Sequence, residues 1–148
     1  MSASASELTI SATRWNARLL GAFGPILILT GLGGFLLPSR FALLSGAAPY
    51  DLFHLFFGAL GTALVLARNA RGVAIFNLAF GLGDLYQAAA GMLGLFPARL
   101  FHYRPGDHLA HLVLGLLLAV VGWWGLRPGS DQFGASTPPP SVGRTPTR

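Results

Sequence analysis

Hydrophobic residues gather in four long stretches of the chain, and short segments with the charged and turn-forming residues separate these stretches. A helix needs about 20 predominantly apolar residues to cross a hydrocarbon core about 30 Å thick. The pattern therefore predicts an all-α membrane protein with four transmembrane helices. Their expected bounds are about residues 17–37, 51–68, 72–96 and 107–126.

The two ends of the chain lie outside this pattern. Residues 1–16 form a predicted cytoplasmic N-terminal segment, and residues 17–126 form the four-helix transmembrane domain. The first apolar stretch exceeds the roughly 7–15 apolar residues of a signal peptide, so we expect it to be retained. Residues 127–148 are rich in Pro, Ser, Thr and Gly and cannot bury apolar surface, so we predict a disordered cytoplasmic tail.

Two pairs of matching motifs indicate an internal repeat. The motifs 22-AFG-24 and 79-AFG-81 have the same separation as 54-HLFFG-58 and 111-HLVLG-115. Each predicted repeat is a helix, a loop and a second helix, so the chain returns to the side where it started. Two such copies share one orientation in the membrane. We therefore interpret the domain as a duplicated helical hairpin, which is a parallel repeat.

Composition supports a membrane location. The chain is 53% hydrophobic and 10% charged, against about 25% charged residues in a typical soluble domain. Its net charge of +5 comes from arginines that flank the apolar stretches and form no basic stripe, so we expect no nucleic-acid partner. The chain has no cysteine, which excludes disulfides, thiolate metal ligands and a catalytic thiol.

Arginines are distributed unequally between the two sides of the predicted membrane. One side has Arg14, Arg18, Arg68, Arg71, Arg127, Arg144 and Arg148, and the other has Arg40, Arg99 and Arg104. Cytoplasmic loops carry an excess of basic residues, and tryptophans favour the membrane boundary. The arginine-rich side also holds the three tryptophans. We therefore predict a multi-pass protein of the cell (inner) membrane with both termini in the cytoplasm.

Small residues follow the histidines of the second and fourth predicted helices at helical spacing. Residues three and four apart lie on one helix face, and small residues let membrane helices approach closely. We therefore expect these faces, and a similar face of the third helix, to pack inside the bundle. The packing residues that we predict are Gly58, Gly61, Gly81 and Gly115.

The strings 51-DLFHLFFGALGTALVLAR-68 and 107-DHLAHLVLGLLLAVVG-122 share an H-L-x-x-G motif with an aspartate shortly before the histidine. They resemble a group of small bacterial four-helix membrane proteins, domain-of-unknown-function family 4383, over about residues 17–126. The resemblance implies a four-helix membrane fold and assigns no activity. The loop between the first two helices is shorter than this family leads us to expect.

Ionisable residues inside a membrane are functional candidates, because burying them is costly. The candidate intramembrane polar site comprises His54, Asp84, His108 and His111. In the simplest interpretation, the histidines form hydrogen bonds between helices, with backbone carbonyls, nearby aspartates or each other. Asp84, near the middle of its helix, would then donate one hydrogen bond across the bundle in its protonated form.

Two further interpretations stay open. His54, His108 and His111, with Asp51 and Asp107, have the imidazole and carboxylate groups of a metal site, although H-x-x-H alone is a weak signal. Asp84 beneath a histidine also resembles part of a proton or small-solute path. That path lacks a second acid and a clear exit on the cytoplasmic side.

No catalytic motif occurs, because the chain lacks G-x-G-x-x-G, P-loop and G-x-S-x-G patterns. We therefore predict a non-enzymatic integral membrane protein with a structural or interaction role and no cofactor. The alternative is a proton, metal or small-solute carrier, or a redox-associated membrane subunit. Expected partners are the lipid bilayer and either a second copy of the chain or another membrane protein.

Overall fold

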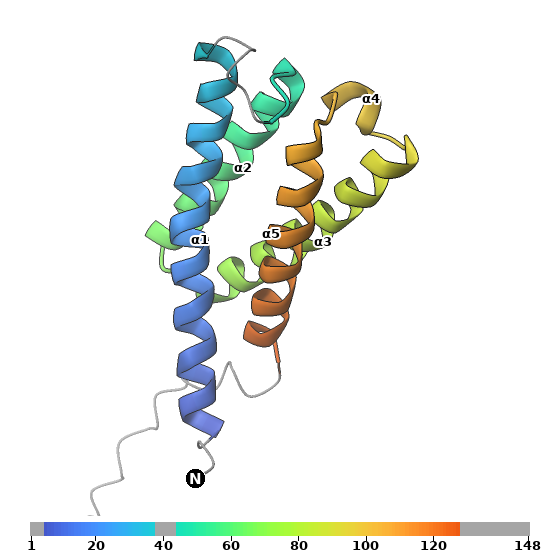
Figure 1. The fold of residues 1–148 in the computed structure, drawn as a ribbon. Helices are drawn as coiled ribbons and strands as arrows, with labels where there is room; N and C mark the ends of the chain where they lie inside the picture. Colours follow the sequence, from blue (N-terminus) through green and yellow to red (C-terminus); the bar gives the residue numbers. More distant parts are fainter. Residues whose placement is uncertain (1–4, 38–43, 128–148) are drawn as a thin grey trace, which may run out of the picture.

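The computed structural model describes residues 5–37 and 44–127. These residues form helices and no strand. The helices are α1 (Ala5–Leu36), α2 (Ala48–Leu66), α3 (Ala70–Leu93), α4 (Ala98–Phe101) and α5 (Pro105–Gly125). All except α4 contain a segment long and apolar enough to cross a membrane (Figure 1). The predicted all-α membrane fold with four spanning helices is thus confirmed.

The start of the first helix and the end of the third differ from the approximate bounds expected. The first helix begins at Ala5, so most of the predicted N-terminal segment 1–16 is helical. Residues 5–16 contain no proline or glycine, and nothing in them stops the helix from extending outward. Its membrane-crossing part is Ser11–Leu36, and the helix continues through Pro25.

The third helix ends at Leu93 and not at residue 96. Gly94 follows in the left-handed conformation, with a φ of 69°, and its N–H donates to the carbonyl of Ala90. Glycine adopts this conformation at low cost, so it ends the helix. The short helix α4, which the sequence pattern does not predict, follows before α5 begins. Of the predicted tail 127–148, residues 128–148 lie outside the described residues.

The four long helices form two closely packed pairs. Helix α1 packs mainly against α2, and α3 mainly against α5, while α1 also contacts α3 and α5 (Figure 1). We call the first pair with its connection hairpin 1 and the second pair hairpin 2. In the described part of the chain, the backbones of α2 and α5 do not lie close together along their lengths.

Buried glycines mark the crossing point of each hairpin. A Cβ atom added at Gly58 would lie 2.8 Å from the carbonyl oxygen of Gly24. In hairpin 2, a Cβ atom at Gly81 would lie 2.7 Å from the carbonyl oxygen of Gly115 and would overlap the backbone nitrogen of Ala119. The two glycine pairs have the same sequence separation, as the repeat requires. The repeat itself stays a prediction.

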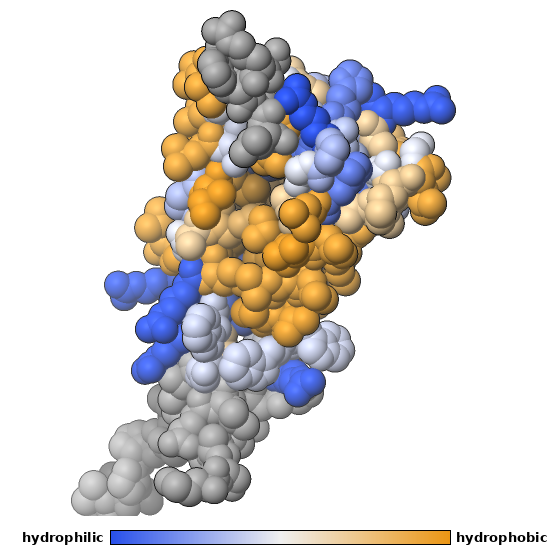
Figure 2. Space-filling view, viewed as in Figure 1, coloured by the Kyte–Doolittle hydropathy of each residue, from blue (hydrophilic) through white to orange (hydrophobic). Residues whose placement is uncertain are grey.

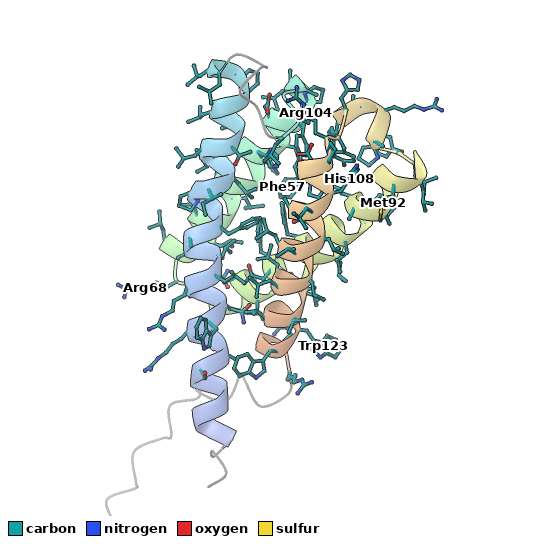
Figure 3. The ribbon with its side chains drawn as sticks, in the orientation of Figure 1. Phe57, Arg68, Met92, Arg104, His108 and Trp123 are labelled. Atoms are coloured by element: carbon teal, nitrogen blue, oxygen red, sulfur yellow. The ribbon has the colours of Figure 1, made fainter. Side chains whose placement is uncertain are left out.

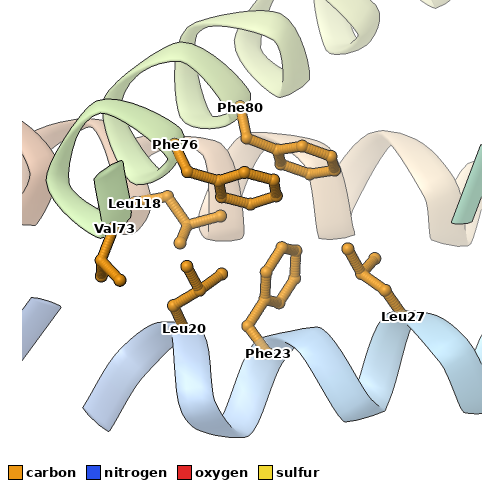
Figure 4. Packing of buried hydrophobic residues seen from close by; sticks show 7 residues of the cluster. All are labelled: Leu20, Phe23, Leu27, Val73, Phe76, Phe80 and Leu118. Atoms are coloured by element: carbon orange, nitrogen blue, oxygen red, sulfur yellow. The ribbon is translucent and has the colours of Figure 1, made fainter. Parts of the chain in front are cut away.

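The apolar core lies between the two hairpins. It contains Leu20, Phe23 and Leu27 of α1, Val73, Phe76 and Phe80 of α3, and Leu118 of α5 (Figure 4). We call these seven residues the apolar layer. Phe23 meets Phe80 edge to face at 5.5 Å between ring centroids. Because lipid is as apolar as these side chains, close packing is the main source of their stabilising effect.

The surface has the pattern of a membrane protein. On the face seen in Figure 2, hydrophobic side chains form a band across the middle, and hydrophilic side chains lie above and below it. Trp15 and Trp123 are exposed toward one end, and the guanidinium of Arg18 lies 5.9 Å from the centre of the Trp15 ring. Aromatic and basic side chains at one end are typical of a membrane boundary.

Candidate functional site

Most of the buried ionisable side chains gather at one end of the bundle. This end holds the starts of α2 and α5 and lies opposite the end with Trp123 (Figure 3). We call the group the polar cluster. Its buried members are Tyr50, Asp51 and His54 of α2, Asp84 and Gln87 of α3, and Asp107 and His111 of α5; the half-buried Tyr103, between α4 and α5, and His108 of α5 also belong to it.

Tyr50 links the two hairpins at the centre of the polar cluster. Pro49 stands in the first turn of α2, where its fixed φ suits a helix start, and Tyr50 follows it. The Tyr50 hydroxyl forms a hydrogen bond of 2.7 Å with Nε2 of His111 on α5. Its ring lies 4.2 Å from the His54 ring and 5.2 Å from the Phe101 ring, between centroids. Tyr50 is therefore enclosed on several sides.

Asp107 joins the start of α5 to the connection before α2. Its carboxylate accepts hydrogen bonds from the backbone N–H of Arg104 at 2.6 Å and of Ser45 at 2.9 Å. The Ser45 hydroxyl in turn donates to the carbonyl oxygen of Phe101. A carboxylate in the first turn of a helix also interacts favourably with the helix dipole. Asp107 is thus a capping residue that also bridges the hairpins.

Asp84, Gln87 and Tyr103 form a short chain of polar contacts within hairpin 2. The Tyr103 hydroxyl donates to Oε1 of Gln87 at 2.7 Å, and Nε2 of Gln87 lies 3.5 Å from Oδ1 of Asp84. Burial raises the pKa of Tyr103, and the carboxylates of Asp107 and Asp84 raise it further. The phenol therefore stays protonated and acts as a donor to Gln87.

Several buried polar atoms of the cluster have no hydrogen-bond partner in the described part of the chain. They are both carboxylate oxygens of Asp51 and the Nδ1 atoms of His54, His108 and His111. Asp51 is 1% exposed and packs directly against Gly34 of α1. Unpaired buried polar atoms are costly, so these positions are where a proton or small polar molecule would gain most from binding.

The structure does not assemble the three histidines into a metal site. Among the described residues, no group of three or more His, Asp or Glu side chains is arranged to hold a metal ion. Tyr50 contacts both His54 and His111 and occupies Nε2 of His111. The fourth histidine, His102, is exposed at the end of α4. The suggestion of a metal bound by His54, His108 and His111 therefore has no support in the geometry.

A second polar contact lies on the other side of the apolar layer. The Asn77 amide of α3 donates to Oδ1 of Asn16 on α1 at 2.9 Å. Asn16 donates to the carbonyls of Ala12 at 2.9 Å and Val121 at 2.8 Å, which connects α1 to α5. Along α3 and α5, Phe80 and Leu118 separate this contact from the polar cluster. The two polar regions are therefore not continuous.

The sequence pattern located the site only in part. His54, Asp84, His108 and His111 do lie in one half of the bundle, but the tyrosines that connect them were missed. Tyr50 lies directly before Asp51, and Tyr103 lies in a connection, so neither interrupts an apolar stretch. Asn16 was missed because it was placed outside the first helix.

No family model, curated protein or solved structure matches this chain. The resemblance to domain-of-unknown-function family 4383 therefore stays a prediction.

Proposed function

We propose that this protein is a small integral membrane protein with a structural or interaction role. In this proposal the polar cluster holds the two hairpins in a fixed relation. The observation that carries it is the buried hydrogen bond between Tyr50 and His111, which crosses from hairpin 1 to hairpin 2. Asp107 supports the same joint through the backbone N–H of Ser45.

The geometry favours a structural role over transport, because the polar cluster does not continue through the apolar layer to the other side of the bundle. Phe80 and Leu118 lie between the polar cluster and the Asn16–Asn77 contact. Hydrogen bonds between membrane helices contribute about 0.6 kcal/mol on average, so a joint of several bonds adds modest stability and a defined orientation. Such a rigid unit suits contact with a second copy or with another membrane protein.

Replacing Tyr50 by Phe tests this role. We expect hydrogen exchange to become faster at the start of α2 and at the start of α5, while the centre of each hairpin stays protected. The matched control is Tyr86→Phe, because the Tyr86 hydroxyl donates to the carbonyl of Phe96 within hairpin 2. Equal exchange in both variants would contradict a joint between hairpins.

The second candidate function is a proton or small-solute carrier. Support comes from the carboxylate of Asp51 and the imidazole nitrogens, which have no partner among the described residues, and from the neighbouring polar chain from Asp84 to Tyr103. Purified protein in liposomes would be compared with Asp84→Asn in a proton-flux assay. The structural role predicts no flux above empty liposomes for either. If the wild type transports protons and Asp84→Asn abolishes this flux, the carrier function is correct and the structural role is not.

We further propose that the protein belongs to family 4383 and lies in the cell inner membrane with both termini in the cytoplasm. An even number of spans and the unequal arginine distribution support this orientation. Because the chain has no cysteine, single cysteines at Ser2 and Ala47 can be labelled with an impermeant reagent. In intact cells we expect labelling only at Ala47→Cys, and labelling only at Ser2→Cys would reverse the orientation.

A further inference from the structure

A cavity of about 350 Å³ lies between α2, α3 and the α4 segment. Its lining is almost wholly apolar and rich in aromatic rings. The aromatic lining residues are Phe53, Phe57, Tyr86, Phe96 and Phe101, and Gly83 and Gln87 of α3 also line the cavity. Helices α2 and α3 make few contacts with each other compared with the contacts inside each hairpin. The cavity is therefore a gap between the hairpins beside the polar cluster.

The cavity is open at the surface of the molecule. Tyr86 and Phe96 on its lining are 51% and 75% exposed; Tyr86 lies within the candidate span Ala70–Leu93, and Phe96 lies just beyond its end. A Cβ atom added at Gly83 would meet no other atom within 4 Å, so the wall has open space at this position. Because the rings of Tyr86 and Phe96 lie at the surface, a membrane-soluble molecule would enter the cavity from this side.

Gln87 is the amide side chain on the lining of this apolar cavity. Its side chain is 5% exposed, and its amide oxygen already accepts from Tyr103 at 2.7 Å. The amide nitrogen has two hydrogens, and its contact with Asp84 is long at 3.5 Å. Among the described residues, this contact accounts for one of the two hydrogens at most, so the other can donate to a ligand. A ligand with an acceptor atom would satisfy it.

We propose that this cavity binds the ring of a membrane-soluble carbonyl compound of the quinone class, with a ring carbonyl accepting a hydrogen bond from Gln87. Aromatic walls favour a flat ring by stacking and edge contacts. Small-molecule sites have volumes of about 300–1,000 Å³, so this cavity holds a single ring and its substituents, and not a whole lipid. The apolar tail of such a compound would extend into the bilayer.

A phospholipid acyl chain is the competing occupant. It fills apolar space equally well, but it has no acceptor for the Gln87 amide and gains nothing from flat aromatic walls. Binding of a quinone should therefore depend on its carbonyl group and on the Gln87 side chain, whereas binding of an acyl chain should depend on neither. The proposal does not depend on the joint between Tyr50 and His111, which does not line the cavity, and Gln87 is the member of the polar cluster that does.

Equilibrium binding to the full chain in lipid nanodiscs tests the proposal, with empty nanodiscs subtracted. The probes are a tritiated benzoquinone with a decyl chain and tritiated decylbenzene, which lacks the carbonyls. We expect saturable binding of the quinone and at least about 3-fold weaker binding of decylbenzene, the effect of one hydrogen bond. Equal affinity for the two probes would overturn the proposal.

Two variants place the binding in this cavity. The Cβ atom of Gly83→Leu would lie in open space and its branched side chain would take up cavity volume, so we expect this variant to weaken quinone binding about 10-fold or more. The control Ala59→Leu adds the same bulk on the exposed surface of α2, outside the lining, and we expect unchanged affinity. Unchanged quinone affinity in Gly83→Leu would show that the cavity is not the site.

Gln87→Leu tests the hydrogen bond itself. We expect it to weaken quinone binding about 3- to 10-fold while decylbenzene binding is unchanged. Tyr103→Phe is the control, because it removes the same contact to Gln87 but keeps the amide donor. If Tyr103→Phe weakens quinone binding as much as Gln87→Leu, the amide is not the recognition group and the proposal fails.

Discussion

The contacts inside each hairpin differ from the contacts between the hairpins. Inside a hairpin, glycines bring backbone against backbone, at Gly24 and Gly58 in hairpin 1 and at Gly81 and Gly115 in hairpin 2. Between the hairpins, the contacts are made by side chains, with the apolar layer in the middle and a polar region on either side. A backbone contact tolerates no added atom, whereas a side-chain contact can be rearranged.

This difference indicates where the molecule is rigid and where it can change. Each hairpin is a unit whose packing depends on the absence of a Cβ atom. The joint between hairpins depends on hydrogen bonds that are individually weak in a membrane. The cavity at Gly83 lies between α2 and the α3–α4 part of hairpin 2. A bound molecule would therefore contact both hairpins and affect how they pack against each other.

Adding one methyl group at Gly81 should produce the largest effect. The new Cβ atom in Gly81→Ala would overlap the backbone of Ala119, which cannot move without shifting α5. We expect a loss of about 2–3 kcal/mol in the free energy of unfolding, near the upper part of the usual range for overpacking. Unfolding by a denaturing detergent would measure it.

Gly83→Ala on the same helix is the matched control, because its Cβ atom would meet nothing within 4 Å. We expect its free energy of unfolding to stay within about 0.5 kcal/mol of wild type. Similar losses in Gly81→Ala and Gly83→Ala would mean that the close backbone contact does not hold hairpin 2 together.

Removing the amide of Asn77 should have a smaller effect. Asn77→Leu keeps the approximate volume but leaves the Asn16 oxygen without its donor on α3. Losing a buried hydrogen bond in a membrane protein costs up to about 1.7 kcal/mol, and we expect a loss of about 1–1.5 kcal/mol. The same detergent titration would detect it. A loss as large as that of Gly81→Ala would show that side-chain contacts between the hairpins are as sensitive as backbone contacts inside them.

The part of the fold that could be predicted from the sequence follows mainly from the hydrophobic pattern and the spacing of glycines. The four spans follow from the length of the apolar stretches, because lipid leaves few other structures possible. The start of α1 at Ala5 could not be predicted, since a polar sequence without proline or glycine is equally compatible with helix and coil. The short helix α4 is also invisible to periodicity, because four residues cannot display a helical repeat.

The polar site was less predictable than the fold. Spacing placed His54 and His111 on inward faces, but the partner of His111 is Tyr50, which is far from it in sequence. Asp84 reaches Tyr103 only through Gln87. Such pairs depend on how the two hairpins lie against each other, and one sequence contains no signal for that relation.

The smallest effect should be the coupling between Tyr50 and His111. A double-mutant cycle of Tyr50→Phe and His111→Phe keeps a ring at both positions and removes their hydrogen bond. We expect a coupling free energy of about 0.6 kcal/mol, the average for such bonds in membranes. The control cycle combines Tyr50→Phe with Asn77→Leu, which lie on opposite sides of the apolar layer and should add within about 0.5 kcal/mol. If the first cycle is also additive, the bond contributes nothing to the joint, and the apolar layer alone holds the hairpins together.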